Sequence, residues 1–163
     1  MIKKDNIKHL LKNNFKEFEY IQQPISEQEI NNWKSLGYTH SSYAGLMYDS
    51  RNVMPEWVHE IGSHLNLLDA TYTFYKMRTL DIMPPHVDHF SRYRELFCDD
   101  ITKIRRAIVF LEDWKPGHYF EINKIGVVNW QAGDYILWNH DVEHAASNIG
   151  IESRYTLQVT GHV

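Results

Sequence analysis

The pattern of hydrophobic and polar positions changes partway along the chain. Over residues 1–68, apolar residues recur every three to four positions, as they do on the buried face of an α-helix. From Ala70 onward the repeat falls to two, and β-branched and aromatic residues dominate, which is typical of strands. We therefore expect helices and loops over residues 1–68 and short strands over residues 69–163.

Three helices are predicted in the first part, over residues 2–15, 26–36 and 55–68. The first is rich in lysine and has apolar residues at helical spacing. The second begins with a capping box, in which Ser26 and Glu29 can satisfy each other's backbone donors. The third follows a proline suited to a first helical turn and carries a regular apolar stripe.

The predicted strands are short and closely spaced. They cover residues 70–75, 104–111, 118–122, 125–130, 134–139, 142–147 and 154–160. Glycine, asparagine and proline punctuate the gaps, as expected for turns. The gaps are too short for helical crossovers, so a parallel α/β sheet is disfavoured. Many short strands joined by turns indicate a mainly β fold, a barrel or jelly roll.

One segment, residues 89–103, fits neither repeat. It is polar with scattered apolar residues, and we interpret it as a long loop or short helix over one mouth of the barrel. Loops of this length are often lids. No internal repeat or low-complexity linker divides the chain. We therefore expect a single domain over residues 1–163, with residues 1–68 flanking a β core over residues 69–163.

Composition narrows the class of protein. A chain of 163 residues suits one domain, and the net charge of −4 argues against a dedicated nucleic-acid-binding protein. The single cysteine, Cys98, excludes an intramolecular disulfide framework and a cysteine-rich zinc site. No apolar run approaches the ~20 residues of a membrane span, and the N-terminus lacks an apolar signal core. We expect a cytoplasmic protein without a membrane partner.

The candidate chemistry begins with His86 and Asp88. Residues two apart in a strand point to the same face, so this imidazole and this carboxylate would project together into the barrel. Two ligands are too few to hold a divalent metal, and a third must come from elsewhere. The downstream candidates are His118, His140, His144 and His162.

His144 is favoured by the residues that follow it. A hairpin centred near Ile149 would place His144 opposite Arg154, with Thr156 on the same face as Arg154. Two histidines and one carboxylate on one side of an ion form the facial triad of non-haem iron(II) oxygenases. Three positions stay open, for a chelating 2-oxo acid and for dioxygen. The far carboxylate of a dicarboxylic co-substrate needs a cation, and Arg154 suits it.

These residues resemble the iron(II)/2-oxoglutarate-dependent oxygenase superfamily, whose pattern is H-x-D, a distal histidine, and an arginine or lysine about ten residues later. The match is His86, Asp88, His144 and Arg154, with Thr156 two positions on. Residues 130–157 are most similar to the aspartyl/asparaginyl hydroxylase-like and prolyl hydroxylase-like branches, and the resemblance spans about residues 70–163.

The resemblance implies a double-stranded β-helix, a cupin-like barrel that binds iron(II), 2-oxoglutarate and O2. It implies that 2-oxoglutarate is decarboxylated to succinate while a substrate carbon is hydroxylated. Family members that halogenate lack the carboxylate that Asp88 provides here. The substrate it suggests is an amino-acid side chain of a peptide, a protein or a free amino acid. It also suggests co-substrate roles for Tyr75 and Arg106, although the branch pattern R-x-H is interrupted by Ile108.

Two other classes of function stay open. One is a cupin-like metal-binding barrel of another chemistry, such as an isomerase or a hydrolase. The other is a barrel that only binds a ligand. Arg154 favours the oxygenase over the first alternative, because a barrel that takes no dicarboxylate has no need for an interior cation there. The complete triad argues against the second alternative.

Overall fold

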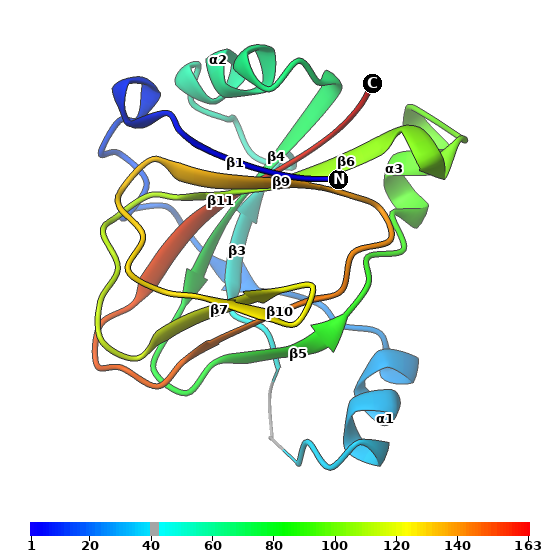
Figure 1. Ribbon diagram of the computed structural model, residues 1–163, viewed down its shortest axis with the longest axis vertical. Coiled ribbons are helices and arrows are strands. Elements are labelled where there is room, and N and C mark those ends of the chain that lie inside the picture. Colours follow the sequence, from blue (N-terminus) through cyan, green and yellow to red (C-terminus); the bar gives the residue numbers. More distant parts are fainter. Residues whose placement is uncertain (40–42) are drawn as a thin grey trace.

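Two antiparallel sheets face each other in the computed structural model, which describes residues 1–39 and 43–163 (Figure 1). The larger sheet has, in spatial order, β1 (Ile2–Asn6), β9 (Asp134–Asn139), β6 (Ile104–Phe110), β11 (Arg154–His162), β4 (Leu68–Met77), β3 (Leu46–Asp49) and β2 (Ile21–Gln22). The smaller sheet has β5 (Ile82–His86), β10 (His144–Asn148), β7 (His118–Ile122) and β8 (Ile125–Val127). The mainly β architecture is the one expected.

Short helices surround the sheets. They are α1 (Glu27–Ser35), α2 (Trp57–His64), α3 (Ser91–Leu96) and the 3-10 turns η1 (Lys8–Leu10) and η2 (Ile101–Lys103). Figure 1 shows α2 on the outer face of the larger sheet, α1 beyond β5, and α3 at one end of the barrel. In the described part of the chain, no helix combines the length and the apolar character that a membrane crossing requires.

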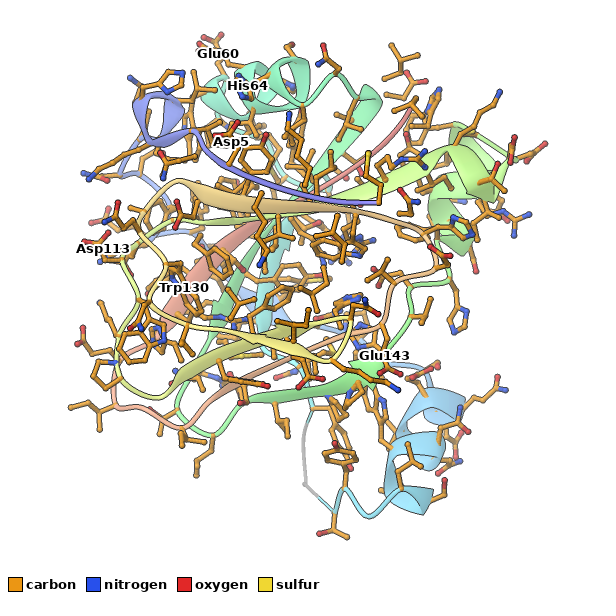
Figure 2. The ribbon with its side chains drawn as sticks, in the orientation of Figure 1. Asp5, Glu60, His64, Asp113, Trp130 and Glu143 are labelled. Carbon is orange, nitrogen blue, oxygen red and sulfur yellow. The ribbon has the colours of Figure 1, made fainter. Side chains whose placement is uncertain are left out.

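Successive side chains of a strand point to opposite faces of the sheet, so the larger sheet contributes to two separate hydrophobic cores. In β6, Ala107 and Val109 pack toward α2, whereas Ile108 and Phe110 pack between the two sheets. This strand is buried on both faces, which explains why its sequence is apolar almost throughout. Figure 2 shows Trp130 between the sheets, and its ring stacks on Phe110 with centroids 4.1 Å apart.

The predicted helix over residues 2–15 is wrong. Residues 2–6 form β1, which pairs antiparallel with β9 at the edge of the larger sheet, and only the single turn η1 follows. All of β1 is exposed, so it lacks the alternation that marks a half-buried strand. Ile7 is the anchor: it is completely buried, and its N–H donates to the Gly133 carbonyl at 2.9 Å.

The other two predicted helices are present. Ser26 caps α1 by accepting a hydrogen bond from the Glu29 N–H at 3.2 Å. The third helix is shorter than predicted, because α2 ends at His64 and β4 begins at Leu68. Strands β2 and β3 were also not expected, so residues 1–68 contribute strands to the larger sheet as well as flanking helices.

The expected hairpin that joins His144 to Arg154 is also wrong. Strand β10 belongs to the smaller sheet and β11 to the larger one, so residues 149–153 cross between sheets instead of turning back within one. His144 pairs in register with His86 and Ile122, and Arg154 pairs with Met77. The two residues nevertheless border the same cavity, because the sheets that carry them face each other.

Candidate metal centre

Three side chains converge at the end of the barrel near α3. His86 is the last residue of β5, His144 is the first residue of β10, and the two are direct partners across the strands. Their ring centroids lie 4.3 Å apart. Asp88 follows His86 by two residues, and one ligand atom from each of the three side chains lies within 4.8 Å of the others. In Figure 2, Glu143, the neighbour of His144, marks this end of the barrel and Asp113 the opposite end.

The backbone fixes which ring nitrogen each histidine presents. The Nδ1 atom of His86 lies 2.8 Å from the Pro84 carbonyl, and that of His144 lies 3.1 Å from the Val142 carbonyl. A carbonyl only accepts, so each Nδ1 carries the proton and donates it. Both Nε2 atoms are then left with a free lone pair beside Asp88. This is the arrangement that orients histidine ligands in metal sites.

Two tryptophans support the imidazole rings. Trp33 of α1 meets the His86 ring edge-on at 6.0 Å, and its indole N–H donates to the Pro85 carbonyl at 3.3 Å. Trp138 of β9 lies against His144, with ring centroids 5.0 Å apart. Both indoles are almost completely buried. The rings are therefore positioned by the packed interior and not by a surface loop.

The protonation states of the cluster suit a cation. Burial lowers the pKa of His144 to about 4, although Asp88 acts in the opposite direction, so this ring is neutral near neutral pH. Burial opposes ionisation of Asp88, but the opposing electrostatic contributions, of which that of Arg106 is the largest, outweigh burial and hold its pKa below the usual value. The cluster thus offers a neutral His144 nitrogen and a carboxylate beside the Nε2 atom of His86.

The donor set fits a divalent transition metal. Asp88 Oδ2 is buried and accepts no hydrogen bond from the described residues, although it lies 3.5 Å from His144 Nε2. His86 Nε2 lies 3.7 Å from Asp88 Oδ1. Arg106 compensates this carboxylate from one side only, and a cation between the carboxylate and the two imidazole lone pairs would bind all three ligand atoms. Among the described residues, this is the one group of three with metal-ligand spacing.

A cavity runs from the triad into the barrel. Its volume is about 70 Å³, room for about five water molecules. Besides the triad, its walls include the predicted site residues Tyr75, Arg106, Arg154 and Thr156. The structure therefore brings all the predicted site residues to one cavity. His118 and His162 hydrogen-bond elsewhere, to the Glu152 carbonyl and to Tyr93.

Arg154 is a buried cation with spare donors. The residue is 5% exposed, Nη1 donates to the Tyr119 carbonyl at 2.7 Å, and Nε has no hydrogen-bond partner among the described residues. Burial lowers the pKa of Arg154 to about 10, so it keeps its charge near neutral pH. Thr156, two residues along the same face of β11, is also buried. A buried guanidinium without a carboxylate partner is costly, and an anionic ligand would relieve that cost.

Tyr75 and Arg106 flank the cavity from neighbouring strands. Tyr75 pairs with Thr156 across β4 and β11, and burial raises its pKa to about 12, which keeps the phenol neutral. Arg106 Nε lies 3.2 Å from Asp88 Oδ2. Arg106 therefore neutralises the carboxylate of the triad from the side.

Two glutamines in the cavity wall were missed by the sequence analysis. Gln158 continues the inward face of Arg154 and Thr156, so the alternation along β11 contained the signal for it. Gln23 follows the two-residue strand β2, and its buried Oε1 has no hydrogen-bond partner in the described part of the chain. Nothing in the local sequence marks Gln23, because its position depends on the pairing of β2 with β3.

Comparisons with known proteins identify the fold. No protein-family model matches the chain, and no curated sequence matches it. A prolyl-4-hydroxylase from Pseudomonas putida is similar in structure, with a TM-score of 0.56 and 14% identity over 83% of this chain and 82% of that one. A Klebsiella pneumoniae protein with a double-stranded β-helix domain matches with a TM-score of 0.41 and 15% identity, over 58% and 68% of the two chains. The two facing antiparallel sheets, together with the similarity to the prolyl-4-hydroxylase, identify the fold as a double-stranded β-helix.

A predicted oxalate decarboxylase from Thermotoga maritima is also similar. It has a TM-score of 0.45 and 14% identity, over 72% of this chain and 80% of that one.

Proposed function

We propose that this double-stranded β-helix protein is an iron(II)- and 2-oxoglutarate-dependent dioxygenase that hydroxylates an amino-acid side chain. The proposal is supported by a His–Asp–His cluster that can hold a metal and by a buried arginine in the same cavity. With iron(II) and 2-oxoglutarate bound, the site would supply the oxidative chemistry that converts 2-oxoglutarate to succinate and hydroxylates a substrate carbon.

Arg154 is the observation that carries the proposal. A metal-binding barrel of another class needs three protein ligands and an open coordination position, but it does not need a desolvated guanidinium at the far side of the cavity. Arg154 has such a position: no described residue accepts a hydrogen bond from its Nε, and the Thr156 hydroxyl lies on the same strand face. Guanidinium and hydroxyl together form a site that matches the far carboxylate of a 2-oxo diacid.

Each residue of the cavity has a defined task in this proposal. His86, Asp88 and His144 hold iron(II) on one side and leave the other side open. Arg154 binds the far carboxylate in a bidentate manner and Thr156 donates a hydrogen bond to it. Tyr75, which is neutral, can donate from its phenol to the same co-substrate. Trp33 and Trp138 keep the imidazole rings in place and exclude water from their outer sides.

Binding of 2-oxoglutarate tests the proposal directly. Iron(II)-loaded wild type and Arg154→Ala would be titrated with 2-oxoglutarate without oxygen, following the metal-to-ligand charge-transfer band. Loss of a desolvated, charge-assisted contact should cost about 2–5 kcal/mol of binding free energy. That corresponds to a rise in Kd of roughly thirtyfold to several-thousandfold.

Arg105→Ala is the matched control. Arg105 lies in the same sheet, next to Arg106 but on the opposite face of β6, and its Nη1 is already satisfied by the Thr102 and Ile104 carbonyls. This variant should bind 2-oxoglutarate like the wild type. Iron binding should be unchanged in both variants, because neither arginine is a ligand. Equal 2-oxoglutarate affinity in wild type and Arg154→Ala would overturn the proposed function.

A further inference from the structure

Arg106 has more hydrogen-bonding capacity than its contact with Asp88 uses. Its Nε lies 3.2 Å from Asp88 Oδ2, close enough for an ion pair but not aligned for a hydrogen bond. Its guanidinium carbon lies 4.8 Å from the centre of the Phe90 ring. The described residues form no hydrogen bond with its two terminal nitrogens. One face of the group is therefore covered, one edge faces Asp88, and the edge with both terminal nitrogens is left for a ligand.

The position of Arg106 separates it from Arg154. Arg106 pairs with Thr160 on β11, six residues from Arg154, which corresponds to about 20 Å along the strand. Arg106 is partly exposed, whereas Arg154 is buried. Arg154 thus lies deep in the barrel, and Arg106 lies beside the triad nearer the mouth. The two arginines are suited to two different anions.

The charges of the cavity favour a second anion. Among the described residues that line it, the charged side chains on its inner face are Asp88, Arg106 and Arg154. Lys76 also borders the cavity, but its ammonium lies 5.8 Å from the centre of the Tyr155 ring, on the other face of the sheet. A divalent metal and a dianionic co-substrate would cancel each other. One positive charge would then remain beside the triad, and in a partly dry site it would favour a negatively charged substrate.

We infer that Arg106 binds a free main-chain carboxylate of the substrate, an inference that rests on the proposed function. A residue inside a polypeptide has no such group, because its carboxyl is part of a peptide bond. A free amino acid is a zwitterion and brings no net negative charge to balance Arg106. The substrate is therefore an N-acylated amino acid or the last residue of a peptide, and its side chain is the part that reaches the metal. Gln158, which also lines the cavity, offers an amide for the neutral N-acyl group.

The test compares acids with amides. The probes are the twenty N-acetyl-L-amino acids and the corresponding N-acetyl-L-amino acid amides, which represent chain ends and chain interiors. Binding to protein loaded with zinc(II) and 2-oxoglutarate would be followed by saturation-transfer NMR, so that turnover is not required. In the wild type, at least one acid should bind about tenfold or more tightly than its amide, as expected for a hydrogen-bonded charge pair.

Three variants isolate the role of Arg106. Arg106→Gln should lose the preference for the acid, and Arg106→Lys should keep part of it through charge without the planar fork. Arg105→Gln removes the same charge from the opposite face of the strand and should keep the full preference. Zinc content is measured for every variant, and Arg106→Lys, which retains a cation beside Asp88, remains informative if Arg106→Gln loses the metal.

The outcomes separate this inference from the proposed function. If the best acid loses affinity when placed at the end of a tetrapeptide, the substrate is a small molecule, and if it keeps affinity, the substrate is a peptide end. The inference is overturned if no acid is preferred over its amide, or if the preference survives without Arg106. It is also overturned if Arg106→Gln weakens 2-oxoglutarate binding as Arg154→Ala does. Failure of the wild type to bind 2-oxoglutarate would instead refute the proposed function, and the probes can still be tested on protein loaded with zinc alone.

Discussion

The carbonyls of Pro84 and Val142 fix the orientation of the two histidine ligands. Each accepts from the Nδ1 of a histidine two residues later, so that both rings turn Nε2 toward Asp88. Pro84 lies where the register between β5 and β10 shifts, between the pairs His144–His86 and Ala146–Met83, and Val142 lies just before β10. The ligand positions are therefore built into the strand ends.

The triad makes a prediction about metal affinity. His86→Ala, Asp88→Ala and His144→Ala should each weaken iron(II) or zinc(II) binding by more than the roughly 10–100-fold lost when an outer-shell partner is removed. Metal competition titrations would measure this. His140→Ala is the control. His140 lies outside the cluster, so this variant should bind the metal as tightly as the wild type does. A requirement for His140 with a dispensable His144 would refute the ligand assignment.

His118 predicts a pH dependence of stability. Burial lowers the pKa of this ring below its ordinary value of 6.5, although the contact with the Glu152 carbonyl opposes the shift. As pH falls from 6.5 through the lowered pKa, the unfolded chain takes up a proton that the folded protein does not, so the free energy of unfolding decreases. Urea denaturation at about pH 7.5 and about pH 5.5 should show this loss, and His118→Gln should reduce it. If His118→Gln lost as much stability between the two pH values as the wild type does, other groups would be the cause of the loss.

Much of the site could be predicted at the residue scale, but not all the reasons were correct. The alternation along β11 placed Arg154 and Thr156 on one face, as the structure has them. His86 and Asp88 also come together, but not as two residues of one strand, because β5 ends at His86. His144 was correctly grouped with them through a hairpin that does not exist. Sequence distance cannot distinguish a turn within one sheet from a crossing between two, because both need only a few residues.

At the scale of elements, β1 depends on a single buried residue. Ile7→Ala should lower the free energy of unfolding by about 2–5 kcal/mol, because it leaves a cavity in the core beneath η1. Ile2→Ala is the matched control. Ile2 is 37% exposed at the other end of the same segment, and its loss should change stability by at most about 0.5 kcal/mol. Urea denaturation measures both, and equal losses would contradict the anchoring role of Ile7.

The crossing from β10 to β11 depends on close contact between two loops. Gly117 has φ of +92°, and a Cβ there would lie 2.2 Å from the Gly150 nitrogen. Gly37 has φ of +100° but open space around it. Gly37→Ala should therefore cost only the conformational penalty of about 1–2 kcal/mol. Gly117→Ala should cost more, because the backbone of the facing loop must also move. Thermal unfolding would compare them, and equal Tm values would show that the contact is readily relaxed.

For the molecule as a whole, the choice of metal distinguishes the possible chemistries. Zinc(II) should bind the triad, because two imidazoles and a carboxylate suit it, but it should not support formation of succinate from 2-oxoglutarate. Zinc has no second oxidation state to use, whereas iron(II) has. Succinate would be measured with each metal under air. Full activity with zinc would instead indicate a hydrolase or isomerase, the alternative that the fold also permits.

The fold class could be predicted from the sequence because alternation and turn residues are local signals. These gave the strands β6, β7, β9 and β11 close to their observed bounds. The distribution of strands between sheets could not be read in the same way. Strand β1 is exposed and rich in charge, and β2 has only two residues, so each is a strand solely because a neighbouring edge pairs with it. Whether such a segment forms a strand is therefore determined by the partner strand and not by the residues of the segment itself.

The edge pairing of β1 has a consequence for the order in which the protein is assembled. Ile2 pairs with Trp138, so β1 must wait for a strand that is synthesised more than a hundred residues later. At about 5–20 residues per second, β9 is synthesised roughly 7–26 s after β1. During that interval the N-terminal segment has no partner in its own sheet. Because contacts so distant along the chain also slow folding, closure of this edge is expected to be a late event, completed only after most of the barrel has been made.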